Sequence, residues 1–179
     1  MIYIFVATKA EAQAFVDKYK LQKKRHNTIT YFEDEKLRVI ITGIGVQNAI
    51  DVTTTIKQHF ALTKKDTIYN IGIAAANTTY AIGAVVPIKE CHYKEHSIKL
   101  PNDGATLTTL DAPLTTPRDG VFDMEGYGVA FVFSEFDLYI YKVISDHAKP
   151  EMITKDAAKK LVFDAMSQYA GLPGSSVPL

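Results

Sequence analysis

Apolar residues along this chain occur in short continuous runs separated by segments of helical spacing. The runs cover residues 2–7, 37–44, 67–76, 82–88 and 138–144. Runs without alternating polar positions are typical of strands covered on both faces, as in parallel sheets. The pattern therefore predicts a largely parallel central sheet with helices on its faces.

Four segments beside these runs are predicted to be helices. In the first, Ala12, Phe15, Val16 and Tyr19 fall at positions i, i+3, i+4 and i+7, which places them on one helical face. The other three cover residues 46–60, 124–135 and 158–169. Thr154 precedes the last of them and is a candidate N-cap.

The remaining segments are predicted to add short strands, turns and loops. The short strands cover residues 28–33, 89–99, 106–110 and 121–123, with 89–99 as an edge strand. Residues 101–104 form a predicted turn, and residues 20–27 are basic and therefore exposed. We expect one α/β domain over residues 1–170, a three-layer α/β/α fold with a mixed central sheet. Residues 171–179 are rich in Gly, Ser and Pro, which predicts a flexible tail.

Composition narrows the classes of function. The chain has 179 residues, and its 20 basic side chains balance its 20 acidic ones, so no charge excess favours nucleic acid or an anionic membrane surface. No apolar run approaches the length of a membrane span, and no signal peptide is recognisable. The single cysteine, Cys91, excludes an intramolecular disulfide framework and fits a reducing compartment. We expect a cytoplasmic protein.

Three acidic residues stand at positions where ligands bind in α/β folds. Such folds place ligands beyond the carboxyl ends of their strands. Glu11 follows the first predicted strand, and Asp146 ends the last one. Glu125 lies between a short strand and an apolar helix, where an unpartnered acid would be unfavourable. These three carboxyl groups are the candidate chemistry of the chain.

Six short segments, taken in order, resemble the nucleoside phosphorylase and nucleosidase superfamily, and within it the methylthioadenosine/S-adenosylhomocysteine nucleosidases. Two are the signatures Asp123-Met124-Glu125-Gly126 and Val143-Ile144-Ser145-Asp146. The others are a strand with a Glu-bearing loop over residues 2–12, the glycine turn and helix start over 41–49, Asn70-Ile71-Gly72, and residues 82–86. Each segment alone is weak, but their common order over nearly the whole chain is specific.

The resemblance implies cleavage of an N-ribosidic bond without a cofactor or a metal. Asp146 would protonate N7 of the purine as the general acid, with Ser145 holding its side chain. Glu11 would orient and deprotonate the attacking water, a role that suits a carboxylate in the first turn of a helix.

The resemblance also implies how a nucleoside, the expected small-molecule partner, is held. Glu125 would bind the ribose hydroxyls through charge-assisted hydrogen bonds, and Met124 would pack against the sugar. Gly45 and Ala75 are further expected substrate-binding residues. Members of the family pair into homodimers, so a homodimer is expected as well.

Other features depart from the family pattern. Pro113 stands where the family has an aromatic residue that stacks on the base, and a following helix is missing between residues 110 and 121. Ile73 and Ala75 replace smaller residues, and Lys142 replaces an arginine. These changes indicate an altered base pocket, which fits either a different nucleoside or a non-catalytic binding protein.

Simpler interpretations of the same residues remain open. Asp146 could cap a turn, and Glu11 could merely stabilise its helix. Hydrolysis is favoured over phosphorolysis, because phosphate binding needs basic side chains and none of the three arginines lies at a predicted strand end. Lys9, a basic residue that follows the first predicted strand, favours phosphorolysis instead. His92 and His96 have a spacing that suggests a metal, but an edge strand would hold them apart.

Overall fold

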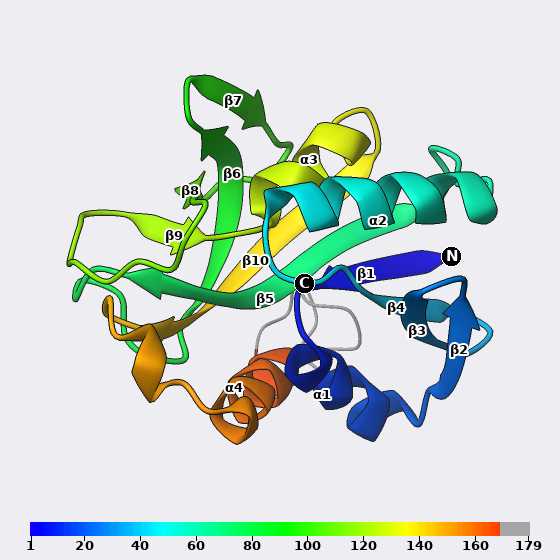
Figure 1. Cartoon of the computed structure of the whole chain (residues 1–179), viewed down its shortest axis with the longest axis horizontal. Coiled ribbons are helices and arrows are strands. Elements are labelled where there is room, and N and C mark those ends of the chain that lie inside the picture. The colour runs from blue at the N-terminus through cyan, green and yellow to red at the C-terminus, as the bar shows by residue number, and fades with distance from the viewer. Residues whose placement is uncertain (169–179) are drawn as a thin grey trace.

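The computed structural model describes residues 1–168 as one α/β unit (Figure 1). Its strands are β1 (Ile2–Val6), β2 (Gln22–His26), β3 (Ile29–Glu33), β4 (Leu37–Ile41), β5 (Thr67–Ala76), β6 (Val85–Tyr93), β7 (His96–Lys99), β8 (Ala105–Thr109), β9 (Val121–Asp123) and β10 (Asp137–Asp146). Its helices are α1 (Lys9–Tyr19), α2 (Val46–His59), α3 (Gly126–Phe133), the 3₁₀ helix η1 (Pro150–Met152) and α4 (Lys155–Gln168).

The described strands form one mixed sheet that closes on itself at one end. Parallel pairing joins β4 to β1, β1 to β5, and β5 to β10. From β10 the sheet continues through β6, β8 and β9, and β9 pairs back onto β5. A five-stranded ring results, with the antiparallel strands β3 and β2 at the opposite edge. The mixed central sheet predicted from the sequence is confirmed.

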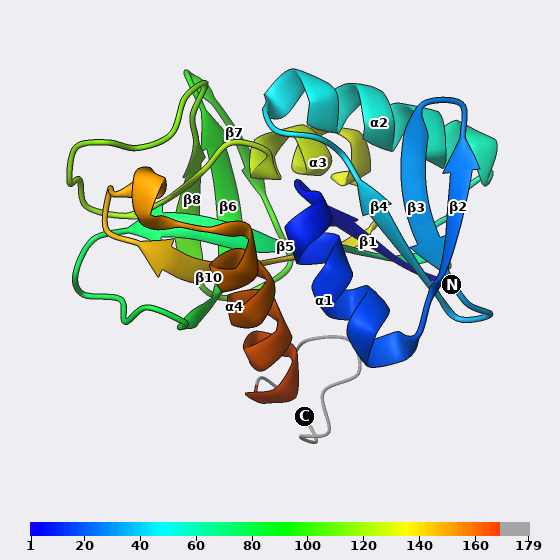
Figure 2. The same ribbon diagram turned by 60° about the horizontal axis from the view of Figure 1, so that its bottom comes forward.

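Helices cover the two faces of the sheet in pairs (Figures 1 and 2). Helices α1 and α4 pack together on one face, and α2 and α3 on the other. Alternate residues of β1 serve the two sides: Tyr3 and Phe5 belong to the cluster under α2 and α3, and Ile4 and Val6 to the cluster under α1 and α4. A strand with two buried faces reads as a continuous apolar run, so the three-layer prediction is confirmed.

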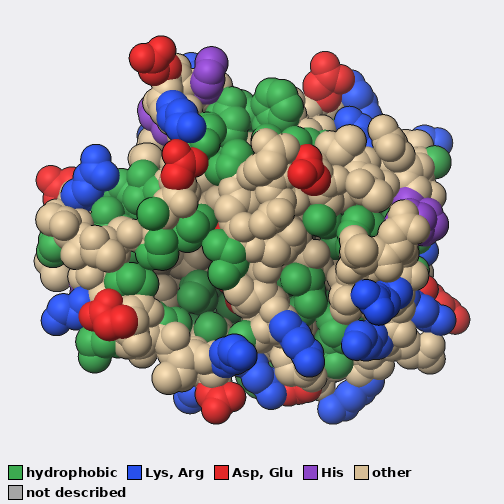
Figure 3. Space-filling model, viewed as in Figure 1, with side chains coloured by type: hydrophobic (Ala, Val, Ile, Leu, Met, Phe, Trp, Pro, Cys, Tyr) green, Lys and Arg blue, Asp and Glu red, His purple; other side chains and the backbone are tan. Residues whose placement is uncertain are grey.

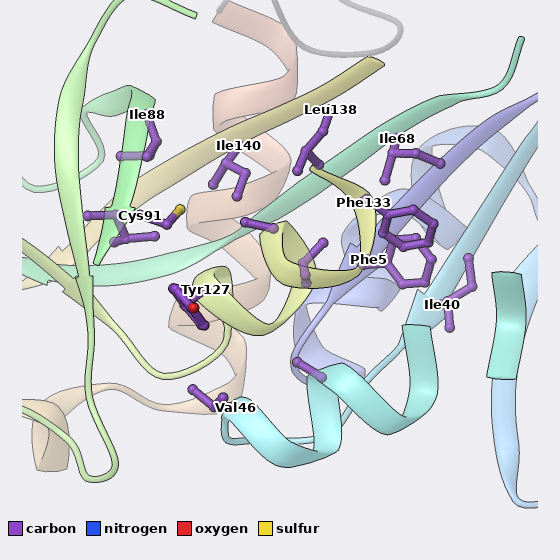
Figure 4. Close-up of a cluster of buried hydrophobic side chains, with 14 of the residues drawn as sticks. Phe5, Ile40, Val46, Ile68, Ile88, Cys91, Tyr127, Phe133, Leu138 and Ile140 are labelled. Atoms are coloured by element: carbon purple, nitrogen blue, oxygen red, sulfur yellow. The ribbon is translucent and has the colours of Figure 1, made fainter. Parts of the chain in front are cut away.

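The larger core cluster lies between the sheet and α2 and α3 (Figure 4). The rings of Phe5 and Phe133 lie 5.3 Å apart, and Ile68 and Leu138 are buried beside them. Truncating a buried phenylalanine to alanine typically destabilises a fold by about 3–5 kcal/mol. Cys91 is buried in the same cluster, and burial raises the pKa of its thiol.

Element boundaries differ from the sequence predictions in several places. The helix predicted over residues 124–135 is α3, Gly126–Phe133, and the run over 82–88 becomes a strand only at Val85. Residues 89–99 form the end of β6 and all of β7, because the chain turns at Lys94, which has a positive φ of 54°. The basic segment 20–27 is exposed at residues 22–25 as predicted, but Leu21 is buried, and residues 22–26 pair with β3 as strand β2. Strand β4 ends at Ile41 rather than at residue 44, before Gly43 with φ of 83°.

Thr154 does cap the last helix, since its Oγ1 accepts a hydrogen bond from the backbone N–H of Ala157. The predicted tail, like Tyr169 at the end of the predicted helix, lies outside the described residues. Among residues 1–168, no helix combines the length and the apolar character needed to cross a bilayer.

Candidate active site

A cavity of about 160 Å³ opens at the carboxyl ends of β1, β5 and β10. It lies where the closed ring meets the rest of the sheet, so β9 and the start of α3 also contribute to its wall. Six of the seven site residues predicted from the sequence line it: Glu11, Ala75, Met124, Glu125, Ser145 and Asp146. The sheet thus brings together residues that the sequence separates by more than a hundred positions.

Asp146 enters this cavity from the end of β10, where a bulge interrupts the pairing with β5. Its Oδ2 lies 2.8 Å from the hydroxyl of Ser145, and its Oδ1 accepts a hydrogen bond from the backbone N–H of Lys149. The Ser145 hydroxyl also lies 3.2 Å from the carbonyl oxygen of Ala74.

Because Ser145 has one hydroxyl proton, it can donate either to Asp146 or to Ala74. In the second arrangement its oxygen can accept a hydrogen bond from a protonated Asp146. Both protonation states of Asp146 therefore have a hydrogen-bonded arrangement. The bond from Lys149 shows that Asp146 caps a turn, which is one of the two interpretations of this residue that the sequence left open.

Glu11 has a similar double position in the first turn of α1. Its Oε2 accepts hydrogen bonds from the N–H and hydroxyl of Thr8, which completes a capping box. Its Oε1 accepts a hydrogen bond from the N–H of Ile73 on β5. A Cβ atom on Gly72 would lie only 2.8 Å from the same Oε1, so Gly72 leaves the room that the carboxylate occupies.

Glu125 stands at the N-cap position of α3 and is 7% exposed. Its Oε1 accepts a hydrogen bond of 2.8 Å from the backbone N–H of Gly45. Burial and the nearby charge of Asp123 raise the pKa of Glu125 to about 7. Gly45 does not line the cavity, and its φ of 101° favours glycine. Gly45, which the sequence predicted as a substrate-binding residue, therefore contacts Glu125 and not the cavity.

A buried ion pair lies next to the cavity, and the sequence interpretation gave it no role. The ammonium group of Lys142 lies 2.7 Å from Oδ2 of Asp123 and 2.7 Å from Oδ1 of Asn70. Lys142 is only 2% exposed. One signal could have revealed it: a lysine inside a continuous apolar strand needs a buried partner.

The remaining wall of the cavity is mainly apolar. Leu110, Pro113, Leu114 and Phe122 line it, together with Ile73. Pro113 and Ile73, the two departures noted in the sequence, therefore do lie at the cavity. Among residues 1–168, the one aromatic side chain that lines it is Phe122, and the guanidinium of Arg118 lies 5.7 Å from the centre of its ring.

The ionisable groups on the cavity wall are all acidic. In the part of the chain that the structure describes, four carboxyl groups line it, those of Glu11, Asp123, Glu125 and Asp146, and no lysine or arginine does. Lys9 lines a neighbouring cavity between α1 and α4 instead. Basic side chains gather on the outer surface over α1 and α4 (Figure 3). Within residues 1–168, no three His, Cys, Asp or Glu side chains form a group able to hold a metal ion.

No family model matches the chain, and no curated protein matches it. Solved structures do match, and they include nucleosidases and a futalosine hydrolase. The native futalosine hydrolase of Helicobacter pylori strain 26695 matches with a TM-score of 0.78 and 13% identity, over 92% of this chain and 93% of that chain.

Two 5′-methylthioadenosine/S-adenosylhomocysteine nucleosidases match over a similar range. The Helicobacter pylori protein in complex with butyl-thio-DADMe-Immucillin-A has a TM-score of 0.77 and 14% identity, over 92% of this chain and 93% of that chain. The Streptococcus pneumoniae protein in complex with 8-aminoadenine has a TM-score of 0.73 and 15% identity, over 92% of this chain and 97% of that chain. At these identities the likeness establishes the fold.

Proposed function

We propose that the protein is a nucleosidase that hydrolyses the N-ribosidic bond of a purine nucleoside or thionucleoside. One observation carries the proposal: Glu11, Glu125 and Asp146 come from three distant parts of the chain and line one cavity at the strand ends. The fold shared with solved nucleosidases supports it.

In the proposed reaction, the bond between C1′ of the sugar and N9 of the purine breaks, and its electron pair passes to the base. Asp146 supplies a proton to N7, so that the base leaves as a neutral molecule. The oxygen of a water molecule bonds to C1′, and Glu11 takes the proton that this water loses. Glu125 accepts hydrogen bonds from the ribose hydroxyls, and its negative charge stabilises the cationic sugar.

The acidic side chains of the cavity wall favour water over phosphate as the nucleophile. Phosphate recognition relies on basic side chains and clustered amide donors, above all on arginine. The carboxylates of Glu11 and Glu125 would instead repel an incoming phosphate. We therefore propose hydrolysis, with phosphorolysis as an outcome that the assay must distinguish.

The proposal is tested by base release from the purified protein. Methylthioadenosine, S-adenosylhomocysteine, adenosine, inosine, guanosine and futalosine are each supplied with and without inorganic phosphate. Release that does not need phosphate is expected. Release only with phosphate would replace hydrolysis by phosphorolysis, and no release from any of them, with binding retained, would indicate a binding protein.

The role of Asp146 has a direct test in Asp146→Asn. Loss of the general acid should lower kcat by about 10²-fold or more, since proton transfer of this kind contributes 10²–10⁴-fold. Asp51→Asn on the exposed face of α2 is the matched control and should leave kcat unchanged. Equal activity of the two variants would remove Asp146 from the reaction.

We also propose that the protein acts as a homodimer in the cytoplasm. The family resemblance supports the dimer, and the lone cysteine, Cys91, supports a reducing compartment. Light scattering after size-exclusion chromatography would measure the mass directly. A monomeric mass at micromolar concentration would contradict the dimer.

A further inference from the structure

The ammonium group of Lys142 lies inside the molecule, between the sheet and the start of α3. It contacts Oδ2 of Asp123 at 2.7 Å, and that oxygen also accepts a hydrogen bond from the N–H of Gly126. The other oxygen of Asp123 accepts a hydrogen bond from the hydroxyl of Thr109. Lys142 therefore holds a carboxylate whose remaining bonds fix the first turn of α3.

Glu125 is the residue immediately before that turn. Its position depends on two restraints, the N–H of Gly45 on one side and the turn held by Asp123 on the other. The second restraint depends on Lys142, because its ammonium group contacts the carboxylate of Asp123. A change at Lys142 thus reaches Glu125 through Asp123 and Gly126, although no hydrogen bond joins the two side chains.

Charged side chains of both signs act on Glu125. Asp123 on β9 and Glu11 on α1 are acidic, and Lys142 on β10 is basic. Gly45, at the N-cap of α2, donates its N–H to Glu125, and the neutral Asn70 on β5 bonds to Lys142. Lys142 is therefore a cation that acts on a cluster of three carboxyl groups.

Glu11 belongs to the same cluster through Gly72. A Cβ atom built on Gly72 would lie 2.8 Å from Oε1 of Glu11 and 3.8 Å from Nζ of Lys142. The proposed water-activating carboxylate and the buried ammonium thus face the same point of β5. Glycine at this position keeps side-chain atoms from separating the two charges.

We propose that Lys142 is a positioning residue that fixes Glu125 through Asp123 and favours its ionised form, which binds the ribose hydroxyls. The role differs from that of Asp146 and Glu11, because Lys142 does not line the cavity and touches no reacting atom. The kinetic consequence rests on the proposed nucleosidase function, whereas the charge relation between Lys142 and Glu125 does not.

The balance of charges gives the sign of the effect. Burial, followed by the charge of Asp123, raises the pKa of Glu125, and the charge of Lys142 opposes this rise. Burial acts to lower the pKa of Lys142 itself, but Asp123, Glu125 and Glu11 together raise it, so that the ammonium stays charged. Removing this charge must shift the protonation of Glu125 to higher pH.

Two variants with opposite signs test the inference. Lys142→Gln keeps hydrogen-bonding groups near Asp123 and Asn70 but removes the charge. In the pH profile of kcat/KM, it should move the acid limb to higher pH by about 1 pH unit or more. Asp123→Asn removes the repulsion and should move the limb downward. Lys142→Arg retains the charge and should leave the limb within a few tenths of a pH unit of the parent.

A second readout does not depend on turnover. Carbon-13 labelling of the glutamate carboxyl groups allows Glu125 to be titrated by NMR, with Glu125→Gln assigning its signal. The same opposite shifts are expected in Lys142→Gln and Asp123→Asn. If the parent releases no base while these shifts occur, the proposed function fails and the charge relation stands.

The inference is overturned if Lys142→Gln and Asp123→Asn lower activity equally at every pH and leave the titration of Glu125 unmoved. Lys142 would then be a structural residue only. If Lys142→Gln does not fold, Asp123→Asn and Lys142→Arg still decide, because a fixed Glu125 titration in Asp123→Asn would also contradict the proposal.

Discussion

At the residue scale, one carboxyl group can serve the helix and the cavity together. Glu11 uses Oε2 for the capping box with Thr8 and directs Oε1 to the backbone of β5. Such a side chain has its rotamer fixed by folding, before any ligand arrives. Pre-organisation of this kind is what a residue that orients water requires.

Glu11→Gln separates these two tasks. Glutamine can still form the capping box with Thr8, but its amide nitrogen cannot accept the hydrogen bond from the N–H of Ile73, so the free energy of unfolding should fall by about 1–3 kcal/mol. It cannot accept the proton of a water molecule, so kcat should fall by about 10²-fold or more. Urea unfolding and base release measure the two effects. Glu35→Gln in the exposed turn before β4 is the matched control, and an unchanged kcat in Glu11→Gln would exclude the proposed base.

At the element scale, the position of helix α3 depends on the absence of a side chain at Gly128. A Cβ atom on Gly128 would lie 2.7 Å from the carbonyl oxygen of Val46 and 2.9 Å from Cβ of Ala49. The helix can therefore approach the start of α2 only because residue 128 is glycine. This approach sets Glu125 beside Gly45, so the packing of two helices determines the geometry of the proposed sugar-binding acid.

Gly128→Ala should destabilise the protein although alanine is the better helix former. The gain in helix propensity is about 1 kcal/mol, whereas forced overpacking typically costs 1–3 kcal/mol. We expect a net loss of up to about 2 kcal/mol in the free energy of unfolding, measured with urea. Gln58→Ala, at an exposed position of α2, is the control for a substitution that changes no packing. A stability above that of the parent would show that α2 and α3 can separate freely.

Element types followed the sequence closely where apolar spacing was strong, as in α1, β5 and β10. The pairing of strands did not. The ring closes because β9 pairs with β5 and β8 pairs with both β6 and β9. Strand β2 is another case, since its exposed residues Gln22–His26 carry no apolar pattern and it is held by backbone bonds to β3.

At the scale of the whole molecule, Glu125 links the site to stability. In the folded state its pKa is about 7, compared with 4.5 for an unperturbed glutamate. Between these values the folded state binds more protons than the unfolded state, so the free energy of unfolding decreases as pH rises. Above about pH 7 this loss is complete, and below about pH 4.5 it is absent.

Glu125→Gln removes that titration. Its stability relative to the parent should therefore increase between about pH 5 and about pH 8, with an upper limit of about 3 kcal/mol from the size of the pKa shift. Urea unfolding at both pH values measures the change. Glu135→Gln, with an exposed side chain, is the control. A difference from the parent that is equal at both pH values would contradict a buried, titrating Glu125.

The sequence by itself determined the layers, the order of most elements and the acids at the strand ends. These features depend on local spacing, because a strand buried on both faces and a helix buried on one impose different periods on apolar residues. It also indicated Pro113 and Ile73 as cavity residues, because both lie in segments that the resemblance aligns with a base pocket.

Only the tertiary structure decided which groups touch. The contacts of Gly45 with Glu125 and of Lys142 with Asp123 join residues from different elements, and neither follows from the spacing of residues along the chain. Closure of the sheet brings β9 and β10 to either side of the same strand, β5. The protonation of Glu125 depends on these distances and on burial, and both are properties of the folded chain.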